Sequence, residues 1–384
     1  KSVERRHLMI AAMHRRRRRP RSPQLFLIAW ASARAVAAAG AAAVVEDFSL
    51  LDTEQQKNCL TEHFPEARSG LPTLLNCLGL TKDAAEIGVQ AGVHAQSFLE
   101  HWEGDHLWLV DKWSPSEDHG TGNTFYIDIA NVNGPSTRRQ HLAHCSQRLK
   151  EPLASGRATI LEAESSEAAL RIADHQLDFV YLDARHDLPG VVTDIKAWWP
   201  KVRPGGIFAG HDYVDGEFPE GDFFWITALK EALPELEGSI HMTKEANHFP
   251  SFFVIKTERL ISAKPKNLDP LDTLALDVYK HRSRYFQLWK DTSSGAGGTF
   301  DSACRDTCHG DCQDRASRWS PTLSAGSTLR PFACKEAEGN NDVCGAELVV
   351  DVEAYVGVCQ ERCNITCRQR GGFFDTVGPL LLAA

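Results

Sequence analysis

The sequence predicts an α/β protein in which a doubly wound parallel sheet carries the chemistry and a small disulfide-rich module follows it. Three observations lead to this prediction. Short apolar runs alternate with helical segments between residues 81 and 258, and such alternation is typical of a parallel sheet with helices on both faces. Two of these runs end in an acidic residue and a histidine. Eight of the eleven cysteines lie beyond residue 300.

Length and charge limit the classes of protein to which the chain can belong. With 384 residues it exceeds one average domain, so we expect one catalytic domain with appendages. An apolar fraction of 42%, with nine tryptophans and eighteen phenylalanines, is sufficient for a substantial core. After Val45 the chain holds 32 basic and 50 acidic residues, a formal charge of −18, and such a surface repels nucleic acid. We therefore expect no nucleic-acid partner.

Residues 1–45 have the composition of a targeting segment. A basic block at 15–19 precedes a short apolar run at 25–33 whose end resembles an A-x-A cleavage site, which is the order found in secretory signals. We therefore expect the mature protein in the lumen of the secretory pathway or outside the cell. A transit peptide for plastid or mitochondrion is the alternative. A membrane anchor at 25–45 is less favoured because Arg34 would cost about 2.5–3.5 kcal/mol in lipid, so we expect no stable membrane span.

The predicted elements follow one another in a regular order. Residues 46–80 have a mixed helical pattern that predicts a cap over the entrance of the main domain, which we place at 81–258. Helices are expected around 187–200 and 224–233. The last two strands are separated by only a short polar loop, so they should be antiparallel. The expected strands are 84–89, 106–111, 157–163, 177–183, 205–213, 239–243 and 251–256.

The region after the sheet contains one more predicted helix and then the cysteines. Within 259–298 we expect a helix at 269–290 and a glycine- and serine-rich linker at 291–298. The cysteine-rich module is placed at 299–370 and a tail at 371–384. An even, clustered set of cysteines beside the sequon at Asn364 indicates disulfides and glycosylation in an oxidising compartment.

The spacing of the cysteines suggests how they pair. Two triplets have i, i+4, i+8 spacing, which places three sulfur atoms along one face of a helix. Zinc is the competing interpretation, but the C-x2-C spacing of zinc modules is absent, and eight cysteines allow many other connectivities. Cys59, Cys77 and Cys145, in the first half of the chain, are expected to be buried thiols. Two antiparallel helices could pair Cys304 with Cys367, Cys308 with Cys363 and Cys312 with Cys359, leaving Cys334 with Cys344.

The turn after the first strand has the residues of a nucleoside-binding loop. Gly88 and Gly92 follow the strand closely, and glycines there let the backbone approach a bound nucleoside. Asp111 ends the next strand, where a carboxylate can accept hydrogen bonds from both ribose hydroxyls. Glu86 in the turn opposes phosphate and favours a cofactor that carries an amine or a positive charge. Ordinary tight turns can share this glycine pattern.

Acidic and histidine side chains end the fourth and fifth strands. Asp183 and His186 follow one apolar run, and His211 and Asp212 follow the next, so both pairs should meet at the carboxyl edge of the sheet. Carboxylate oxygens suit magnesium or manganese, so Asp183 and Asp212 could hold a cation with His211 as a third ligand. His186 could then take a proton from a hydroxyl held by the metal. The simpler alternative is that these residues only cap the following helices.

These motifs together resemble the class I S-adenosylmethionine-dependent methyltransferases, and more narrowly the family that includes macrocin-type sugar O-methyltransferases. The segment from Glu86 to Gly92 is similar to the methionine-binding loop of that class, and Glu164 and Ser165 are similar to the segment that lines the adenine. The resemblance covers roughly residues 80–257. It implies a Rossmann-like sheet of order 3-2-1-4-5-7-6 with an antiparallel seventh strand.

The resemblance also implies a reaction, in which a methyl group passes from S-adenosylmethionine to a hydroxyl of a small molecule or glycan. In related sugar methyltransferases the acid at the Asp183 position and an acidic pair at the positions of His211 and Asp212 bind magnesium. The histidine at the His186 position is the proposed base. This sequence keeps Asp212 and has a histidine in place of the first acid of the pair. S-Adenosylmethionine is therefore the expected cofactor and Mg²⁺ a candidate.

Two other functions use the same residues. An NAD-dependent oxidoreductase would need the same ribose acid, but the G-x-G-x-x-G of dinucleotide sites is absent. Binding of S-adenosylhomocysteine rather than NAD would separate the two. The second alternative is a non-catalytic luminal interaction protein, in which a degenerate methyltransferase core carries the cysteine module. Against it, five unrelated polar positions are all kept: Glu86, Asp111, Asp183, His186 and Asp212.

Overall fold

The structure is a computed structural model that describes residues 53–114, 135–244, 249–266, 275–294, 299–319 and 352–383. These residues belong to one compact unit, Leu50–Ala384. The predicted targeting segment, the linker residues 295–298 and the predicted pair of Cys334 with Cys344 lie outside the described residues. None of the helices in the described ranges is long and apolar enough to cross a membrane.

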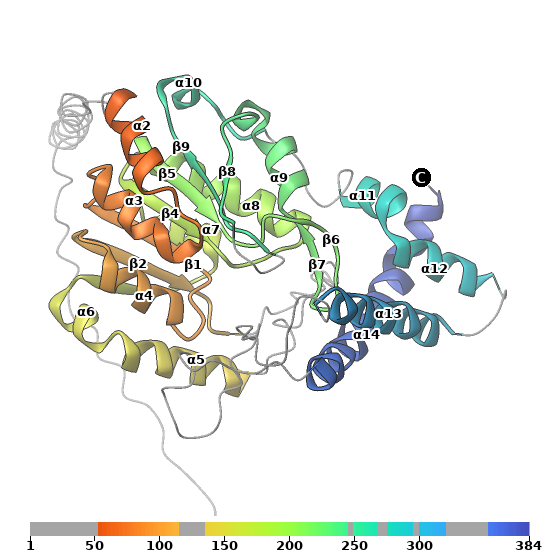
Figure 1. Cartoon of the computed structure of the whole chain (residues 1–384). Helices are drawn as coiled ribbons and strands as arrows, with labels where there is room; N and C mark the ends of the chain where they lie inside the picture. Colours follow the sequence, from red (N-terminus) through yellow and green to blue (C-terminus); the bar gives the residue numbers. More distant parts are fainter. Residues whose placement is uncertain are drawn as a thin grey trace, which may run out of the picture. The chain divides into compact units, whose positions relative to one another are not determined.

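A seven-stranded sheet forms the centre of this unit (Figure 1). The order of its strands is β3-β2-β1-β4-β5-β9-β8. Strand β9 runs antiparallel to both of its neighbours, β5 and β8, and the other adjacent pairs are parallel. Because β8 and β9 are the sixth and seventh strands of this sheet along the chain, the predicted order 3-2-1-4-5-7-6 is confirmed. The strands are β1 (Asp83–Ile87), β2 (His106–Asp111), β3 (Ala158–Glu162), β4 (Leu177–Leu182), β5 (Val202–Gly210), β8 (His241–Met242) and β9 (Phe252–Ile255).

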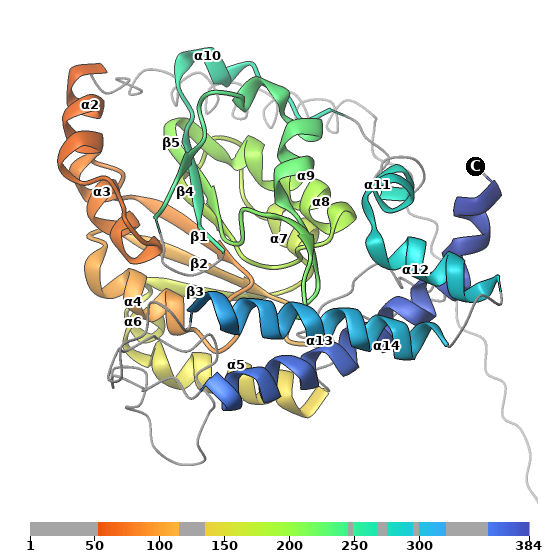
Figure 2. The ribbon, with the colours of Figure 1, turned by 45° about the vertical axis from the view of Figure 1, so that its right-hand side comes forward.

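Helices cover both faces of the sheet (Figures 1 and 2). Successive strand residues point to opposite faces, so Ala84 packs in one apolar cluster and Ala85 in the other. Each cluster joins the sheet to its own set of helices, which is the doubly wound architecture that the sequence predicts. The first set is α2 (Thr53–Glu62), α3 (Leu71–Cys77), α4 (Val93–His101), α5 (Pro135–Arg148) and α6 (Lys150–Ser155); the second is α7 (Ser165–Ala169), α8 (Leu188–Trp198) and α9 (Trp225–Ala232).

Helix α8 shows why this sequence forms a covering helix. A proline stands in its first turn, where the missing N–H costs no hydrogen bond. Its apolar side chains recur at helical spacing and face the sheet, and each contributes about 1.5–3 kcal/mol by burial. The helix ends at Trp198, and a short 3-10 turn, Trp199–Lys201, connects it to β5. The buried apolar side chains are Leu188, Val191, Val192, Ile195 and Trp198.

Three elements differ from the sequence-based expectation. Strand β5 ends at Gly210 rather than at residue 213, because Asp212 adopts φ 53°, which a strand cannot accommodate. A small hairpin of β6 (Asp215–Glu217) and β7 (Asp222–Phe224) then follows, and its short strands were not predicted. The predicted helix at 269–290 is two helices, α11 (Ala275–Arg282) and α12 (Arg284–Ser293).

The break between α11 and α12 has a local cause. The hydroxyl of Ser283 accepts a hydrogen bond from the backbone N–H of Phe286, and a serine in this position stabilises the start of a new helix. A further short helix, α10 (Glu258–Ile261), follows β9. The sequence pattern is helical on both sides of Ser283, so periodicity alone does not reveal the interruption.

One disulfide lies in the cap that precedes the sheet. Cys59 of α2 is bonded to Cys77 of α3, so the prediction of two buried thiols was wrong at these positions. The two cysteines are 18 residues apart, and no spacing rule marks them as partners. Cys145 is free and buried, as predicted, and burial raises the pKa of its thiol to about 12. It is therefore a packing residue rather than a nucleophile.

The cysteine-rich region is a pair of long helices, α13 (Phe300–Trp319) and α14 (Val352–Ala383), which lie side by side in both views (Figures 1 and 2). The three predicted bonds between the triplets are confirmed. Residues 371–383, expected to be a tail, continue α14 and bury Phe373 and Phe374. The bonds are Cys304–Cys367, Cys308–Cys363 and Cys312–Cys359.

Candidate active site

A cavity of about 500 Å³ opens at the carboxyl edge of the sheet. Its walls come from the turn after β1, the end of β2, the segment after β3 and the end of β4. Open α/β sheets bind their ligands at this edge, and the volume is in the usual range for a small-molecule site. The predicted site residues that line the cavity are Glu86, Gly88, Asp111, Glu164, Ser165, Asp183 and His186.

Gly88 brings two of the strand ends together. Its φ is 93°, and a Cβ atom built on it would lie 2.0 Å from the carbonyl oxygen of Asp183. No side chain fits in that space, so only glycine allows the end of β1 to approach the end of β4. Gly88 therefore shapes the cavity and also fixes the position of Asp183.

Gly92 has a different place from the one predicted. It is absent from the cavity lining and precedes α4 with φ 76°. A Cβ atom there would lie 3.1 Å from the sulfur of Cys145 and 3.2 Å from its Cα. The requirement for glycine at this position is therefore set by the packing of α4 against α5, with no contact to the cavity.

Two backbone amides hold the carboxylate of Asp111 in the cavity wall. Gln90 N donates to Oδ2 at 2.9 Å, and Trp113 N donates to Oδ1 at 2.8 Å. The indole of Trp113 in turn donates to the carbonyl of Gln90 at 2.7 Å. Both donors have positive φ, 50° for Gln90 and 41° for Trp113, which is uncommon for residues other than glycine. The two turns are thus adapted to fix the orientation of this acid.

Glu86 has a partner that the sequence did not reveal. Its side chain is almost fully buried, and Oε2 lies 3.1 Å from Nδ1 of His94. The His94 ring stacks on Tyr181 of β4, with 4.5 Å between ring centres. Both Glu86 and His94 line the cavity. A histidine in the first turn of a helix is unremarkable in a sequence, so nothing marked His94 as a site residue.

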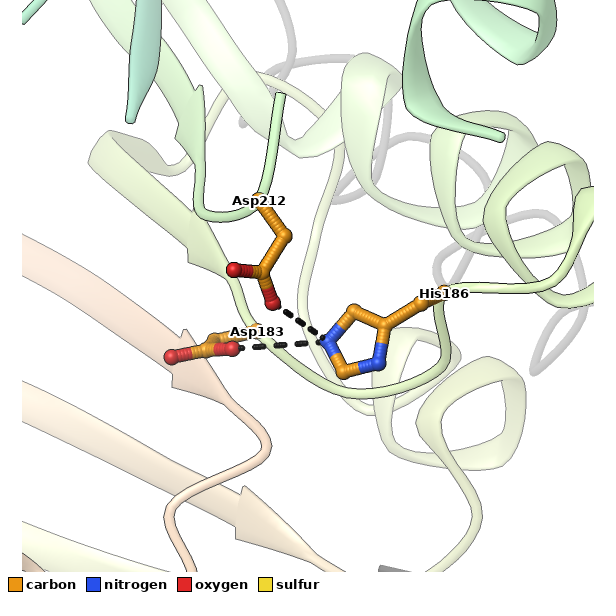
Figure 3. A group of neighbouring side chains, drawn as sticks. All are labelled: Asp183, His186 and Asp212. Atoms are coloured by element: carbon orange, nitrogen blue, oxygen red, sulfur yellow. Dashed lines mark ion pairs between the residues drawn. The ribbon is translucent and has the colours of Figure 1, made fainter. Parts of the chain in front are cut away.

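Asp183, His186 and Asp212 form a compact cluster next to the cavity (Figure 3). The Nε2 atom of His186 lies 3.0 Å from Oδ2 of Asp212 and 3.7 Å from Oδ1 of Asp183. In Figure 3 the imidazole points this nitrogen toward both carboxylates. Asp183 and His186 line the cavity, whereas Asp212 does not. The cluster therefore adjoins the cavity through two of its three members.

His211 lies beside this cluster, next to Asp212. Its Nδ1 is 2.7 Å from Oδ1 of Asp212 and 3.9 Å from Oδ1 of Asp183. The three residues whose ligand atoms all lie within 4.8 Å of one another are Asp183, His186 and Asp212. The imidazole of this group is therefore His186, while the role of His211 as a third ligand stays a prediction.

The charges of the cluster favour ionised acids and a protonated His211. Burial alone would raise the pKa of Asp212, but the positive charge of His211 and hydrogen bonds from His186 and His211 hold it below its ordinary value. The same balance lowers the pKa of Asp183. Burial disfavours the charged form of His211, yet Asp212 and Asp183 raise its pKa. An imidazolium at His211 compensates the charge of the two carboxylates.

Arg68 is a site residue that sequence reasoning missed. It belongs to a 3-10 turn, Arg68–Gly70, between α2 and α3, and its Nη1 lies 3.3 Å from Oδ2 of Asp183. It also lines the cavity. The two residues are 115 positions apart, and an arginine in a polar turn carries no signal of such a contact.

Ser165 contacts a buried acid, Asp194, which also lines the cavity. Its hydroxyl donates to Oδ1 of Asp194 at 2.5 Å and accepts from the indole N–H of Trp198 at 2.8 Å. Burial raises the pKa of Asp194 to about 7. Glu164 precedes Ser165 and forms an ion pair with Lys112. The segment that resembles an adenine-binding segment is therefore anchored by α8 on one side and by the end of β2 on the other.

Part of the sheet domain is similar to a known protein family. A family model described as a methyltransferase domain matches residues 85–213. No curated protein matches the sequence significantly.

Among solved structures, an O-methyltransferase from Bacillus cereus in complex with SAH is 14% identical, with a TM-score of 0.33, over 56% of this chain and 96% of that one. A Burkholderia thailandensis 1,6-didemethyltoxoflavin-N1-methyltransferase is 14% identical, with a TM-score of 0.30, over 63% and 93%. Spermidine synthase from Thermotoga maritima is 16% identical, with a TM-score of 0.29, over 46% and 54%, so the chain spans about half the length of that enzyme.

The matched residues contain β1, β2, β4 and β5 together with the cavity and the cluster. The sheet order is the one that the resemblance to methyltransferases implies. The match favours a methyltransferase over a nicotinamide-dependent oxidoreductase. Through residues 85–213, the chain is similar to a methyltransferase domain.

Proposed function

We propose that the protein transfers the methyl group of S-adenosylmethionine to a hydroxyl of a small molecule or glycan, and that His186 accepts the proton of that hydroxyl. The main support is the position of Nε2 of His186, beside the carboxylates of Asp183 and Asp212. Two carboxylates stabilise the imidazolium that forms when the proton is taken up. A hydroxyl needs such a base because its neutral form is a weak nucleophile.

The residues of the cavity are suited to the cofactor. S-Adenosylmethionine supplies a methyl group that is already activated by a positively charged sulfur. Asp111, fixed by two backbone amides, would accept hydrogen bonds from the ribose hydroxyls. The buried carboxylate of Glu86 would face the amine of the methionine part, and Ser165 would lie near the adenine. With the donor already activated, the protein contributes mainly by aligning the acceptor oxygen with the methyl carbon.

The same cluster fits a divalent cation. Asp183, His186 and Asp212 offer two carboxylates and one imidazole within 4.8 Å, and carboxylate oxygen suits magnesium or manganese. Such an ion would lower the pKa of the acceptor hydroxyl and orient it. Beside ionised Asp183 and Asp212, and without an ion, Nε2 of His186 carries a proton and donates it in a hydrogen bond, so the proton of the acceptor would be taken up at Nδ1. Binding of an ion by Nε2 would require the other tautomer. We favour the proton acceptor, because His211 already compensates the charge of the acids.

The disulfides and the amino-terminal segment support a place in the secretory pathway for this reaction. Four disulfides join described residues, and such bonds persist in oxidising compartments. The acceptor would then be a metabolite or glycan that is present in the lumen or outside the cell. A plastid or mitochondrial location is the alternative, and microscopy of the protein carrying a C-terminal fluorescent tag would distinguish them.

Calorimetric titration with S-adenosylhomocysteine, with and without Mg²⁺, tests the cofactor site. We expect binding in both conditions and negligible binding of NAD. Transfer of labelled methyl from S-adenosylmethionine would then be measured with catechol, simple glycosides and extracted glycans as acceptors. Addition of EDTA should leave the transfer rate unchanged, and a strict requirement for Mg²⁺ would instead assign His186 to the ion.

Replacement of the first acid tests the reacting part of the site. Asp183→Asn should retain S-adenosylhomocysteine binding and lose at least about 10²-fold in transfer rate, because the charge that supports His186 is removed. Asp174→Asn is the control, since Asp174 is largely exposed and pairs with Lys201 outside the cavity. A protein that binds the cofactor product but methylates no acceptor would support the non-catalytic interaction protein.

A further inference from the structure

The β6–β7 hairpin is bound by residues that lie beyond the sheet. In its turn, Glu220 is 3.2 Å from Arg315 of α13 and 3.1 Å from Arg362 of α14. One carboxylate thus joins both of the disulfide-linked helices to the hairpin. Glu217 of β6 accepts from the hydroxyl of Ser283 and from the backbone N–H of Arg284.

One of these contacts is fully buried. Asp222 of β7 and Arg370 of α14 form an ion pair at 2.6 Å, and both side chains have no exposed surface. The guanidinium also donates to the carbonyl of Phe218 at 2.9 Å and lies 4.0 Å from the ring centre of Tyr285. The hydroxyl of Tyr279 donates to the other oxygen of Asp222 at 3.1 Å. Removal of Arg370 would leave a buried charge without its partner, which is strongly destabilising.

The residue after Asp222 contacts the proposed base. The ring of Phe223 stacks on the imidazole of His186, with 4.7 Å between ring centres and 24° between planes. Phe249 stacks on Phe223 in turn at 5.2 Å. The backbone N–H of Phe224 donates to the carbonyl of His186 at 2.9 Å. The hairpin therefore contacts both the ring and the backbone of His186.

We propose that the disulfide-linked helices α13 and α14 are a positioning part of the active site. Through Arg370 and Asp222 they hold the β6–β7 hairpin in place, and through Phe223 the hairpin holds the imidazole of His186 against Asp183 and Asp212. Phe223 is the direct positioning residue, and Arg370 acts through it. The catalytic consequence rests on the proposed function, whereas the structural coupling is measurable without any acceptor.

Nuclear magnetic resonance of labelled histidine tests the coupling directly. A stacked phenyl ring shifts the Cε1–H signal of the imidazole, so Phe223→Leu should move the His186 signal, which His186→Gln assigns. Arg370→Met should move the same signal in the same direction and should speed hydrogen exchange of the Phe224 amide. Arg203→Met is the matched control, because it breaks an arginine pair with the buried Asp178 near the opposite end of β4. It should leave both signals unchanged.

The outcomes separate this proposal from the proposed function. An unchanged His186 signal and unchanged Phe224 exchange in Arg370→Met would overturn the positioning role. If Arg370→Met does not fold, Arg370→Lys and the reduced protein provide the same two readouts. S-Adenosylhomocysteine affinity should stay within about twofold in all folded variants, while kcat falls and KM for S-adenosylmethionine does not. Absence of any methyl transfer by the unmodified protein would refute the proposed function and leave the two resonance readouts intact.

Discussion

The sheet domain and the α13–α14 pair are stabilised by different means. Helix α8 buries a full stripe of leucine, valine, isoleucine and tryptophan against the sheet. The buried face of α13, by contrast, consists mainly of three cysteines and Ala316. The pair is joined by three disulfides and bound to the hairpin by arginine–carboxylate pairs. A small element with few large apolar side chains thus depends on covalent links, as is common where a core is too small.

Reduction of the disulfides should have the largest effect, because it should lower the unfolding temperature of the α13–α14 pair below that of the sheet domain. The three bonds of the helical pair close segments of 63, 55 and 47 residues, and each bond of this kind contributes about 4 kcal/mol in the chain-entropy model. With reductant, α13 and α14 should unfold at a lower temperature than the sheet domain. Circular dichroism melts would show two transitions in place of one. The variant lacking Cys59 and Cys77 serves as the control for the bond in the cap, and a melt unaffected by reductant would contradict the comparison.

A void created by mutation in the core of the sheet domain should have the next largest effect. Ile195→Ala removes a fully buried side chain of α8 and should lower the free energy of unfolding by about 2–5 kcal/mol. Denaturant titration measures the change, and Leu170→Ala, at a side chain that is 84% exposed, should change it by less than about 0.5 kcal/mol. Equal losses in the two variants would mean that α8 is not packed as described.

A methyl group at Gly88 should damage both stability and the site. Gly79 is the matched control, because it also has positive φ, 65°, but nothing lies within 4 Å of a Cβ atom there. Gly79→Ala should cost about 1–2 kcal/mol for the backbone conformation. Gly88→Ala should cost about 1–3 kcal/mol more and abolish S-adenosylhomocysteine binding, since Asp183 must move. Similar stability and retained binding in both variants would show that the close approach of β1 and β4 is not required.

The last predicted effect depends on pH. The folded-state pKa of Asp194 is raised to about 7 from 3.8, so between these values the unfolded chain has lost a proton that the folded protein retains. Stability therefore falls as pH rises through this window. Asp194→Asn cannot ionise, so its stability relative to the unmodified protein should rise by up to about 4 kcal/mol between about pH 4 and pH 8, because the unmodified protein loses about 1.4 kcal/mol per pH unit in this window. Denaturation at both pH values measures the difference, and an equal effect at both would contradict it.

Most of the fold could be predicted because it depends on local patterns. Buried strands such as β4 appear as continuous apolar runs, and the cysteine triplets reveal which helix faces meet. The order of the strands came from the resemblance to a known family. Periodicity could not reveal the Ser283 cap, the positive φ of Asp212 or the small β6–β7 hairpin, because each depends on a single side-chain bond or backbone angle.

The site was predictable to the extent that topology places strand ends together. Asp183, His186 and Asp212 do meet, and Glu86 and Asp111 share a cavity with two of them. The contacts across long sequence separations were not predictable, such as Arg68 with Asp183 and Phe223 with His186. Whether His186 or His211 faces both Asp183 and Asp212 depends on side-chain rotamers. Sequence spacing does not determine rotamers.

The rate of methyl transfer by His186→Gln, with S-adenosylhomocysteine affinity measured on the same preparation, tests the central claim most directly. Glutamine keeps a polar side chain of similar reach but cannot accept a proton from the acceptor. If the cluster is the reacting centre beside the cofactor, affinity should stay within about twofold while the transfer rate falls by about 10²–10⁴-fold. A variant that binds S-adenosylhomocysteine and transfers methyl groups at the unmodified rate would contradict the account.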